Sequence, residues 1–287
     1  MSASHDLRTG IARRPRLRSI ALDILATVVV GVFVFPIVWL YLTALKPREQ
    51  MFGGPLAILP TEVTLANFER IWNAVGFQAA FRNSLIVASA SALIVTFAGL
   101  CAAYSLSRFR YRGSGAFSGA ILAVQMLPGI VIVAPLVLTL RQLGLTDRLL
   151  GLTIAYLLLG LPIATWMLKG YMDDIPRDLD EGATIDGASP FQILWQIILP
   201  LMAPATVAVA AFAFLLAWGE YLFALSLMTS SESRTLPLAL QAAFGQFTID
   251  WGMLTAGGVI ISLPPALLFL YFQRYLVGGL TAGGVKG

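Results

Sequence analysis

The sequence predicts an all-α, polytopic membrane protein with six transmembrane helices and with both ends of the chain on the cytoplasmic side. Three observations lead to this fold class. Hydrophobic residues make up 58% of the 287 residues and charged residues only 12%, with a mean hydropathy of +0.82, whereas a soluble domain carries about 25% charged residues. Six apolar blocks are long enough to cross a bilayer. Lysine and arginine gather on one side of the topology that these blocks define.

The six blocks are predicted spans because a bilayer core needs about 20 apolar residues per helix. They are residues 20–45, 84–107, 115–140, 149–168, 202–228 and 253–273. The first block continues past Pro36, is too long for a signal peptide and has no small-residue cleavage site behind it, so we expect an uncleaved span. In the third block, Pro128 and Pro135 predict a bend. Residues 1–287 are expected to form a single transmembrane domain.

The side of each connection follows from the basic residues, which concentrate in the cytoplasmic segments of membrane proteins. With residues 1–19 as a cytoplasmic tail, the inner side holds Arg8, Arg13, Arg14, Arg16, Arg18, Arg108, Arg110, Arg112, Lys169, Arg177, Arg274 and Lys286. The outer side holds only Lys46, Arg48, Arg70, Arg82, Arg141, Arg148 and Arg234. This excess predicts a cytoplasmic N-terminus and C-terminus. The basic stretch at 13–18 is then a topology signal, and no nucleic-acid partner is expected.

Two connections on the outer side are long enough to carry function. Residues 46–83 contain an amphipathic stretch, 65–77, whose apolar residues recur at helical spacing. Its aromatic residues favour a helix at the lipid headgroups. Residues 229–252 are polar and rich in turn-forming residues at their start. On the inner side, residues 169–201 form the longest connection between spans.

Residue types needed for several classes of chemistry are scarce. The only histidine is His5 and the only cysteine is Cys101, so a histidine-based metal site, a histidine-dependent triad or an intrachain disulfide is not expected. No stretch matches the phosphate-binding pattern G-x-x-x-x-G-K-[ST]. The chain is therefore expected to bind no metal or other cofactor and not to hydrolyse ATP itself. The sequence also contains no recognisable set of catalytic residues for an integral-membrane enzyme.

The inner connection at 169–201 is predicted to fold as a helix, a tight turn and a second helix. Pro176 suits a first helical turn and is followed by acidic residues, which favour a helix N-terminus. The dipeptide Asp186-Gly187 marks a turn. Ser189, Pro190 and Gln192 then fit a second start as N-cap, N1 and capping-box partner. An apolar run leads on to Pro200, where the fifth span begins, so this element is suited to transmit a push to a membrane helix.

Residues 181–200 resemble the cytoplasmic signature of ABC importer membrane subunits. Glu181, Ala183, Gly187, Ile197, Leu199 and Pro200 stand at the spacing of that signature. Gly182 replaces its middle alanine, which weakens the helix by about 1 kcal/mol. The resemblance implies that this helix–turn–helix is a coupling helix seated in a cleft of an ATPase subunit. The residues it assigns to ATPase coupling are Asp180, Glu181, Gly182, Ala183, Asp186, Gly187, Ala188, Pro190, Leu199 and Pro200.

The C-terminal stretch 273–287 resembles the tail of the second permease subunit in the maltose-type family. In that family the glycine-rich tail reaches into the ATPase dimer, where its glycines allow close approach of the backbone. The alternative is that residues 273–287 form a frayed terminus. Within the predicted tail at 274–287, the resemblance assigns docking to Gly279, Leu280, Thr281, Gly283, Gly284 and Lys286. Further stretches of similarity are 81–85, 127–136 and 250–257, and the loop before the sixth span would serve as a scoop toward a binding protein.

The resemblance as a whole implies a permease subunit that forms half of the pathway of an ATP-driven importer for an oligosaccharide, a disaccharide or a polyol. Its implied partners are a second permease subunit, an ATPase homodimer or heterodimer and an extracytoplasmic sugar-binding protein, in a bacterial inner membrane. The alternative is an ion-coupled secondary transporter. That class would favour acidic groups at mid-membrane and inverted repeats, whereas only Glu220 is a candidate and no repeat is visible.

A small set of polar and aromatic residues in the spans is predicted to line the substrate path, because intramembrane ionisable groups are costly and mark functional positions. The set comprises Gln125, Trp218, Glu220, Tyr221 and Asn83. A carboxylate among aromatic rings suits a sugar, whose hydroxyls donate to the acid while its C–H faces stack on the rings. Alternatively, Glu220 forms an interhelical hydrogen bond or anchors the helix at the membrane interface. Asn83 could instead cap a helix.

Overall fold

The computed structural model describes residues 17–52, 59–244 and 249–283, with only the backbone described for 17–21 and 274–283. Within these residues the fold is nearly all helical, and an isolated bridge between Phe244 and Ile249 is its one extended pairing. The helices are α1 (Leu17–Ala44), α2 (Arg48–Phe52), α3 (Ala66–Trp72), α4 (Phe77–Arg108), α5 (Ser114–Gln125), α6 (Gly129–Gln142), α7 (Leu149–Asp173), α8 (Asp178–Ile185), α9 (Pro190–Gln192), the π-helix η1 (Ile193–Ile198), α10 (Leu199–Leu201), α11 (Ala203–Trp218), α12 (Leu222–Leu227), α13 (Leu236–Ala239), the 3-10 helix η2 (Leu240–Ala243) and α14 (Trp251–Gly283).

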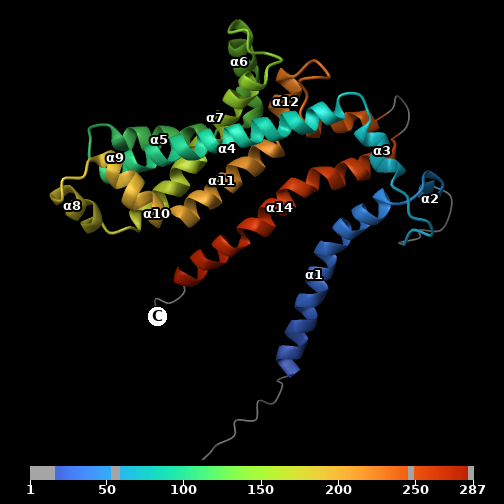
Figure 1. The fold of residues 1–287 in the computed structure, drawn as a ribbon, viewed down its shortest axis with the longest axis horizontal. Coiled ribbons are helices and arrows are strands. Elements are labelled where there is room, and N and C mark those ends of the chain that lie inside the picture. Colours follow the sequence, from blue (N-terminus) through green and yellow to red (C-terminus); the bar gives the residue numbers. More distant parts are fainter. Residues whose placement is uncertain (1–16, 53–58, 245–248, 284–287) are drawn as a thin grey trace, which may run out of the picture.

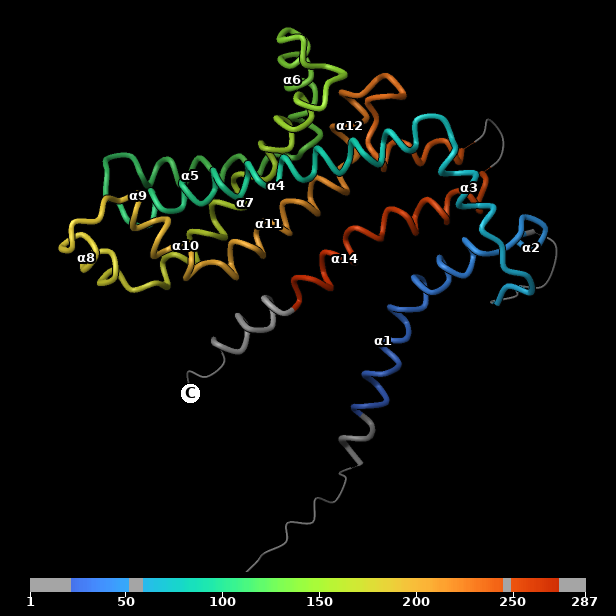
Figure 2. The backbone as a smooth tube through the Cα atoms, in the orientation of Figure 1, coloured from blue at the N-terminus to red at the C-terminus, as the bar shows by residue number. Residues whose placement is uncertain are grey.

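A layered bundle of long helices forms the centre of the molecule. Helix α4 packs along α7 and α11, and α11 packs on α14 (Figure 1). Helix α1 contacts α14 through its C-terminal part and diverges from the bundle toward its N-terminus, as the tube in Figure 2 shows. Helices α8 and α9 lie at one end of α4, and α2 and α3 lie toward the other. The two ends of the bundle therefore carry different sets of connections.

The seam between α4 and α7 depends on glycines that bring the two helices together. A Cβ atom on Gly160 would lie 2.9 Å from Cγ2 of Val95, and one on Gly99 would lie 3.2 Å from Cβ of Ala164. Both positions are in regular helices, so the glycines serve close packing rather than a turn. Small residues at such contacts let membrane helices approach closely. The α4–α7 pair therefore has little room to shift internally.

Four helices are long and apolar enough to cross a membrane, within the residues described: Leu22–Ala44, Phe77–Arg108, Leu149–Asp173 and Trp251–Gln273. Two further helix pairs pass only as bent units, so the count is four to six. The predicted blocks 84–107 and 149–168 lie inside α4 and α7, each of which extends beyond the block. The structure therefore establishes an apolar fold of many helices with four to six candidate spans.

The predicted third span, 115–140, is not one gently bent helix. It consists of α5 and α6, which meet at an angle of 101°. Helix α5 ends at Gln125, and Pro128 precedes α6 with φ −57° and ψ 130°. Proline has no backbone N–H to donate and disfavours the helical conformation of the residue before it, which explains the break. Pro135, by contrast, lies inside α6 without ending it.

The predicted fifth span, 202–228, is also interrupted. Helix α11 ends at Trp218, and α12 begins at Leu222 after a short break. Both carboxylate oxygens of Glu220 accept bonds from the start of α12, from the backbone N–H groups of Phe223 (2.9 Å) and Ala224 (3.2 Å). The Glu220 carboxylate thus satisfies backbone donors that a helix N-terminus leaves free. The interruption is therefore a capped helix start and not a disordered kink.

The amphipathic stretch at 65–77 forms the short helix α3, which packs against α14 and α4. Its Asn67 side chain is buried and donates to the carbonyls of Ala44 (2.9 Å) and Lys46 (2.8 Å). Arg70 pairs with Asp250, just before α14, at 2.5 Å. Helix α3 therefore fastens the end of α1 to the start of α14, in addition to exposing one edge with Trp72.

Candidate functional site

The helix–turn–helix predicted within the connection 169–201 is present at one end of the bundle (Figure 1). Helix α8 has Asp178, Asp180 and Glu181 in its first turn, which suits the positive end of its dipole. It begins at Asp178, so Pro176 precedes the helix instead of lying in its first turn. Gly187 follows with φ +87°, a left-handed conformation that glycine adopts without strain. The predicted tight turn therefore forms at Gly187.

The predicted capping box of the second helix is confirmed. The Ser189 side chain accepts from the backbone N–H of Gln192, and the Gln192 side chain accepts from the backbone N–H of Ser189 at 2.8 Å. The chain then winds as the π-helix η1, which precedes Pro200. Pro200 has no backbone N–H to donate to the preceding turn, and this missing hydrogen bond accounts for the change from α-helical to π-helical winding.

The second helix leads into α11, as expected, but only through a sharp bend. The segment Pro190–Leu201 and helix α11 meet at 84°, with the turn at Met202. Trp195 of η1 instead stacks on Phe97 of α4, with ring centroids 5.9 Å apart. Ile193, Leu194 and Ile198 are buried. The second helix is therefore held against α4 as well as connected to α11.

Three large apolar side chains of α8 and α9 are exposed. Ile185 is 87% exposed, Phe191 69% and Leu179 44%. Exposed apolar groups gathered at an end of a structure mark contact sites for other proteins. Large apolar residues in the predicted helix–turn–helix were an available signal in the sequence, but the predictions rested on the acidic residues of the segment. We call Leu179, Ile185 and Phe191 the apolar tip.

The residues assigned to ATPase coupling divide into exposed and inward-facing groups. Glu181, Gly182, Asp186, Gly187, Pro190 and Pro200 are exposed, whereas Ala183 is buried and Ala188 and Leu199 are partly buried. Asp180 faces into the chain, where its Oδ2 lies 2.7 Å from Nε of Arg108. Burial raises the pKa of the Asp180 carboxyl, and the charges of Arg108 and Arg177 only partly offset that rise. This placement favours an internal role for Asp180 over direct contact with another protein.

The predicted docking tail is only partly described. Gly279, Leu280, Thr281 and Gly283 fall in the last part of α14, where only the backbone is described. Gly284 and Lys286 lie outside the described residues. Their assignment to docking therefore stays a prediction from the sequence.

The five residues predicted to line a substrate path do not meet in one pocket. Trp218 is 3% exposed, stacks on Phe214 and donates its indole N–H to the Ile261 carbonyl at 3.1 Å. Glu220 caps α12. Gln125 and Tyr221 are exposed; Gln125 donates to the Leu159 carbonyl at 3.3 Å, and the Tyr221 hydroxyl accepts from the Gln241 side chain at 2.9 Å.

Asn83 joins the connection between α12 and α13 to α4. It is buried and donates to the carbonyls of Glu232 (2.7 Å) and Arg234 (3.1 Å). Its alternative role as a helix cap is excluded, because α4 already begins at Phe77. The neighbouring Ser84 hydroxyl accepts from the backbone N–H of Leu236 at 2.7 Å. This part of α4 therefore holds the connection between α12 and α13.

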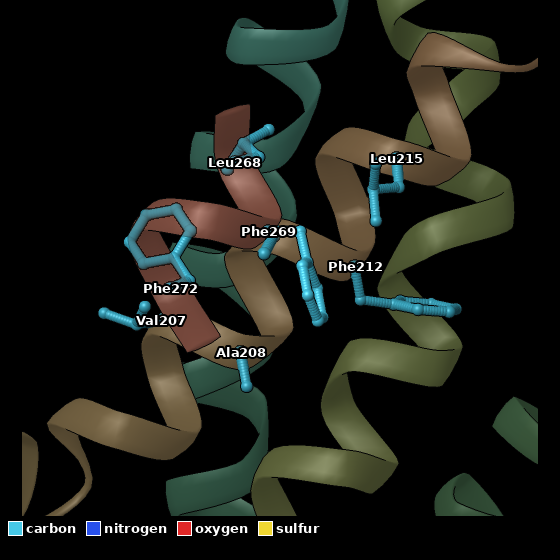
Figure 3. A pocket seen from close by; sticks show the side chains of 8 residues that line it. Val207, Ala208, Phe212, Leu215, Leu268, Phe269 and Phe272 are labelled. Carbon is cyan, nitrogen blue, oxygen red and sulfur yellow. The ribbon is translucent and has the colours of Figure 1, made fainter. Parts of the chain in front are cut away.

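An apolar cavity of about 170 Å³ opens between α11 and α14. Figure 3 shows the side chains that line it, which are Val207, Ala208, Ala211, Phe212, Leu215, Leu268, Phe269 and Phe272. These side chains offer no hydrogen-bonding group to a sugar hydroxyl. No cluster of three or more potential metal ligands occurs in the part of the chain that the structure describes. The cavity is therefore unsuited to a carbohydrate.

Asp147 fastens the connection between α12 and α13 from a second side. Its carboxylate accepts from the backbone N–H groups of Thr229 (2.8 Å) and Ser230 (3.0 Å) and from the Ser233 hydroxyl. Burial raises the pKa of Asp147, but these hydrogen bonds outweigh that effect and hold the pKa well below its usual range. The charged carboxylate therefore stabilises the folded loop.

The Asp147→Asn variant tests this loop anchor through the pH dependence of stability. Because the folded-state pKa is lowered, the stabilisation is present above the ordinary carboxyl pKa and is lost as pH falls through the folded pKa. We expect the variant to be less stable than wild type by about 1–3 kcal/mol at neutral pH, with the difference shrinking below about pH 4. Thermal unfolding of purified protein measures it, and a difference that stays constant into acid would contradict the assignment.

The sequence pattern of the family described as a binding-protein-dependent transport system inner membrane component matches residues 94–281, more than half of the chain. The chain belongs to this family. It is 36% identical over 266 residues to the trehalose transport system permease protein SugB of Mycobacterium tuberculosis, covering 92% of this chain and 96% of that protein. It is 35% identical over 280 residues to the trehalose/maltose transport system permease protein MalG of Thermococcus litoralis, covering 96% and 99%.

The fold of this permease also matches a solved structure. A bacterial ABC transporter involved in import of the acidic polysaccharide alginate aligns with a TM-score of 0.80 at 20% identity, covering 93% of this chain and 99% of the other. The permease is thus a membrane component of a binding-protein-dependent ABC importer, and ATP hydrolysis belongs to a separate subunit. The family confirms the inner-membrane location that the resemblance implied and the non-enzymatic role that the residue content of the sequence predicted.

Proposed function

We propose that this permease imports a carbohydrate, an oligosaccharide, a disaccharide or a polyol, and that it forms half of the pathway with a second permease subunit. The names of SugB and MalG support the substrate class. The observation that carries the proposal is the α8–turn–α9 element, which presents the signature residues and the apolar tip together at one end of the bundle. The remaining partners are an ATPase dimer and an extracytoplasmic sugar-binding protein, and the permease itself needs no cofactor.

The proposed topology has six spans, with the N-terminus and the C-terminus in the cytoplasm. It counts α5 and α6 together as the third span and residues 202–228 as the fifth, with Pro190–Leu201 left in the connection between spans. The distribution of lysine and arginine supports the orientation. Helices α8 and α9 then lie on the cytoplasmic side, where an ATPase can reach them, and α3 and the 229–236 connection lie on the outer side.

The docking surface proposed for the ATPase combines the apolar tip with the exposed signature residues Glu181 and Gly187. Apolar side chains supply contact area, and the carboxylate supplies a charge for a basic group on the partner. Gly187 keeps the turn narrow because it has no side chain. The tail at 274–287 is proposed as a second contact with the same ATPase dimer.

The substrate path is proposed to pass the break between α5 and α6. Non-helical backbone at membrane depth is tolerated only where protein or a water-filled cavity covers it. Met126 in this break is 83% exposed, so the part of the chain that the structure describes does not cover it. We propose that the break faces the second permease and the path between the two subunits. Gln125 and Tyr221 are the proposed direct contacts with the sugar. Trp218, Glu220 and Asn83 are proposed to shape the path from behind it through their bonds within the chain.

Uptake by cells that lack this permease tests the proposed function. We expect the deletion to abolish high-affinity uptake of one carbohydrate within a panel and expect the plasmid-borne gene to restore it. Uptake should need the binding protein and ATP. Loss of uptake on collapse of the ion gradient alone, with ATP maintained, would contradict the proposal and favour an ion-coupled transporter.

The Gln125→Ala and Tyr221→Ala variants test the direct contacts. Gln125→Ala removes an amide and Tyr221→Ala a phenol ring, and the Tyr221 side chain forms no cap hydrogen bond. We expect each variant to raise the substrate concentration at half-maximal uptake about tenfold, as the loss of 1.4 kcal/mol of binding would. Unchanged uptake kinetics and unchanged substrate preference in both variants would remove these residues from the path.

A further inference from the structure

The connection between α7 and α8 wraps around the end of α4. Arg108, the last residue of α4, donates to the Ile175 carbonyl at 3.0 Å. Arg177 donates in the opposite direction, to the Ser107 carbonyl at 2.7 Å. The Ser107 hydroxyl donates to the Asp173 carboxylate at 2.6 Å. These three bonds fasten the ends of α4 and α7 to each other and to the segment that leads into α8.

An ion pair completes this joint from the side of α8. Asp180 and Arg108 lie 2.7 Å apart, and their side chains are only 15% and 6% exposed. Surface ion pairs contribute little, but removing one partner of a buried pair leaves an uncompensated charge. The pair joins the first turn of α8 to the end of α4 and so links the docking element to the bundle by a contact that is costly to break.

The route through α4 is stiffer than the route along the chain. Helices α4 and α7 meet at glycine contacts that leave little room, and α4 also packs along α11. The covalent route from α9 to α11 instead passes through the π-helix η1 and the 84° bend. A displacement of α8 therefore reaches a rigid helix pair directly through Arg108.

We propose that the Arg108–Asp180 pair is the joint through which ATPase-driven movement of α8 reaches the membrane helices, with α4 as the first helix to move. This inference rests on the proposed docking of α8 to an ATPase. Both residues are positioning residues: they contact neither nucleotide nor substrate and act by holding α8 to α4.

A double-mutant cycle in the complete transporter tests the joint. The variants are Asp180→Asn, Arg108→Gln and the two combined, each reconstituted in liposomes with the ATPase, the second permease and the binding protein. We expect both single variants to retain the ATPase on purification, because the apolar tip is intact. We expect each to transport about tenfold less substrate per ATP hydrolysed, since the joint is lost and a buried charge is left unpaired. The combined variant should be no more impaired than either single variant, because all three lack the same contact.

Asp174→Asn is the matched control, because it removes an aspartate charge from the same connection at an exposed position. The transport-to-ATP ratio separates a coupling defect from a folding defect, which would lower the amount of complex instead. Wild-type ratios in both single variants, or a combined variant as impaired as the product of the two, would overturn the inference while leaving docking intact. A wild-type permease that retains no ATPase would overturn the proposed function and this inference together.

Discussion

Replacing Gly187 by valine is expected to reduce ATP-driven uptake at least tenfold while the permease still inserts in the membrane. The reason is conformational. Gly187 has φ +87°, and no atom lies within 4 Å of a Cβ built there, so the added side chain meets open space but a disfavoured backbone. A left-handed conformation costs an L-residue about 1–2 kcal/mol, and more with a branched Cβ. The turn would open, and the apolar tip would lose its arrangement.

The Gly187→Asn variant separates conformation from bulk. Asparagine tolerates the left-handed region better than other non-glycine residues, so we expect it to retain most of the uptake that valine abolishes. Uptake by cells and co-purification of the ATPase measure both variants. Equal uptake by the valine variant and wild type would show that the turn at Gly187 does not matter for coupling.

Replacing Gly160 by valine is expected to have the largest effect on assembly. Even its Cβ would lie 2.9 Å from Cγ2 of Val95, a distance that forces α4 and α7 apart. Overpacking of a close contact costs about 1–3 kcal/mol, and here it acts on the helix pair to which α8 is joined. We expect a lower yield of assembled transporter and earlier thermal unfolding.

Two companion variants make the packing explanation specific. Gly170→Val lies on the same helix, with nothing within 4 Å of its added Cβ, so it carries the same change in helix propensity without the clash and should keep its yield. Gly160→Ala combined with Val95→Ala removes the Cγ atoms that a Cβ at residue 160 would meet and should recover most of the stability lost by Gly160→Ala alone. Equal loss in Gly160→Val and Gly170→Val would point to propensity instead of packing.

The sequence predicted the features that local chemistry decides. The capping box at Ser189 and Gln192 and the turn at Gly187 formed as expected, because a cap and a left-handed glycine depend on a few neighbouring residues. The membrane class followed from composition alone. The signature at 181–200 predicted the family, since its spacing spans a complete structural element.

Features that depend on contacts distant in sequence escaped prediction. Asp180 was assigned to the ATPase, but Arg108 lies 72 positions before it and buries it in an ion pair. Trp218 was predicted to line the substrate path, but its indole N–H donates to the Ile261 carbonyl and its ring stacks on Phe214. Pro128 indicated a bend, yet its angle of 101° depends on how α6 packs against α12. A substrate path between two subunits is also lined by residues of the second permease, which the sequence of one chain does not contain.

Cross-linking from Ile185 tests the central claim most directly, because this side chain is 87% exposed at the apolar tip. A photoreactive amino acid is placed there in the complete transporter in native membranes, with the same group at Val75, which is 88% exposed near the opposite end of the bundle, as the control. We predict an adduct between position 185 and the ATP-hydrolysing subunit on the cytoplasmic face, and none from position 75. An adduct of position 185 with an extracytoplasmic protein, or labelling of position 185 from outside the cell, would contradict the claim that this element couples the permease to ATP hydrolysis.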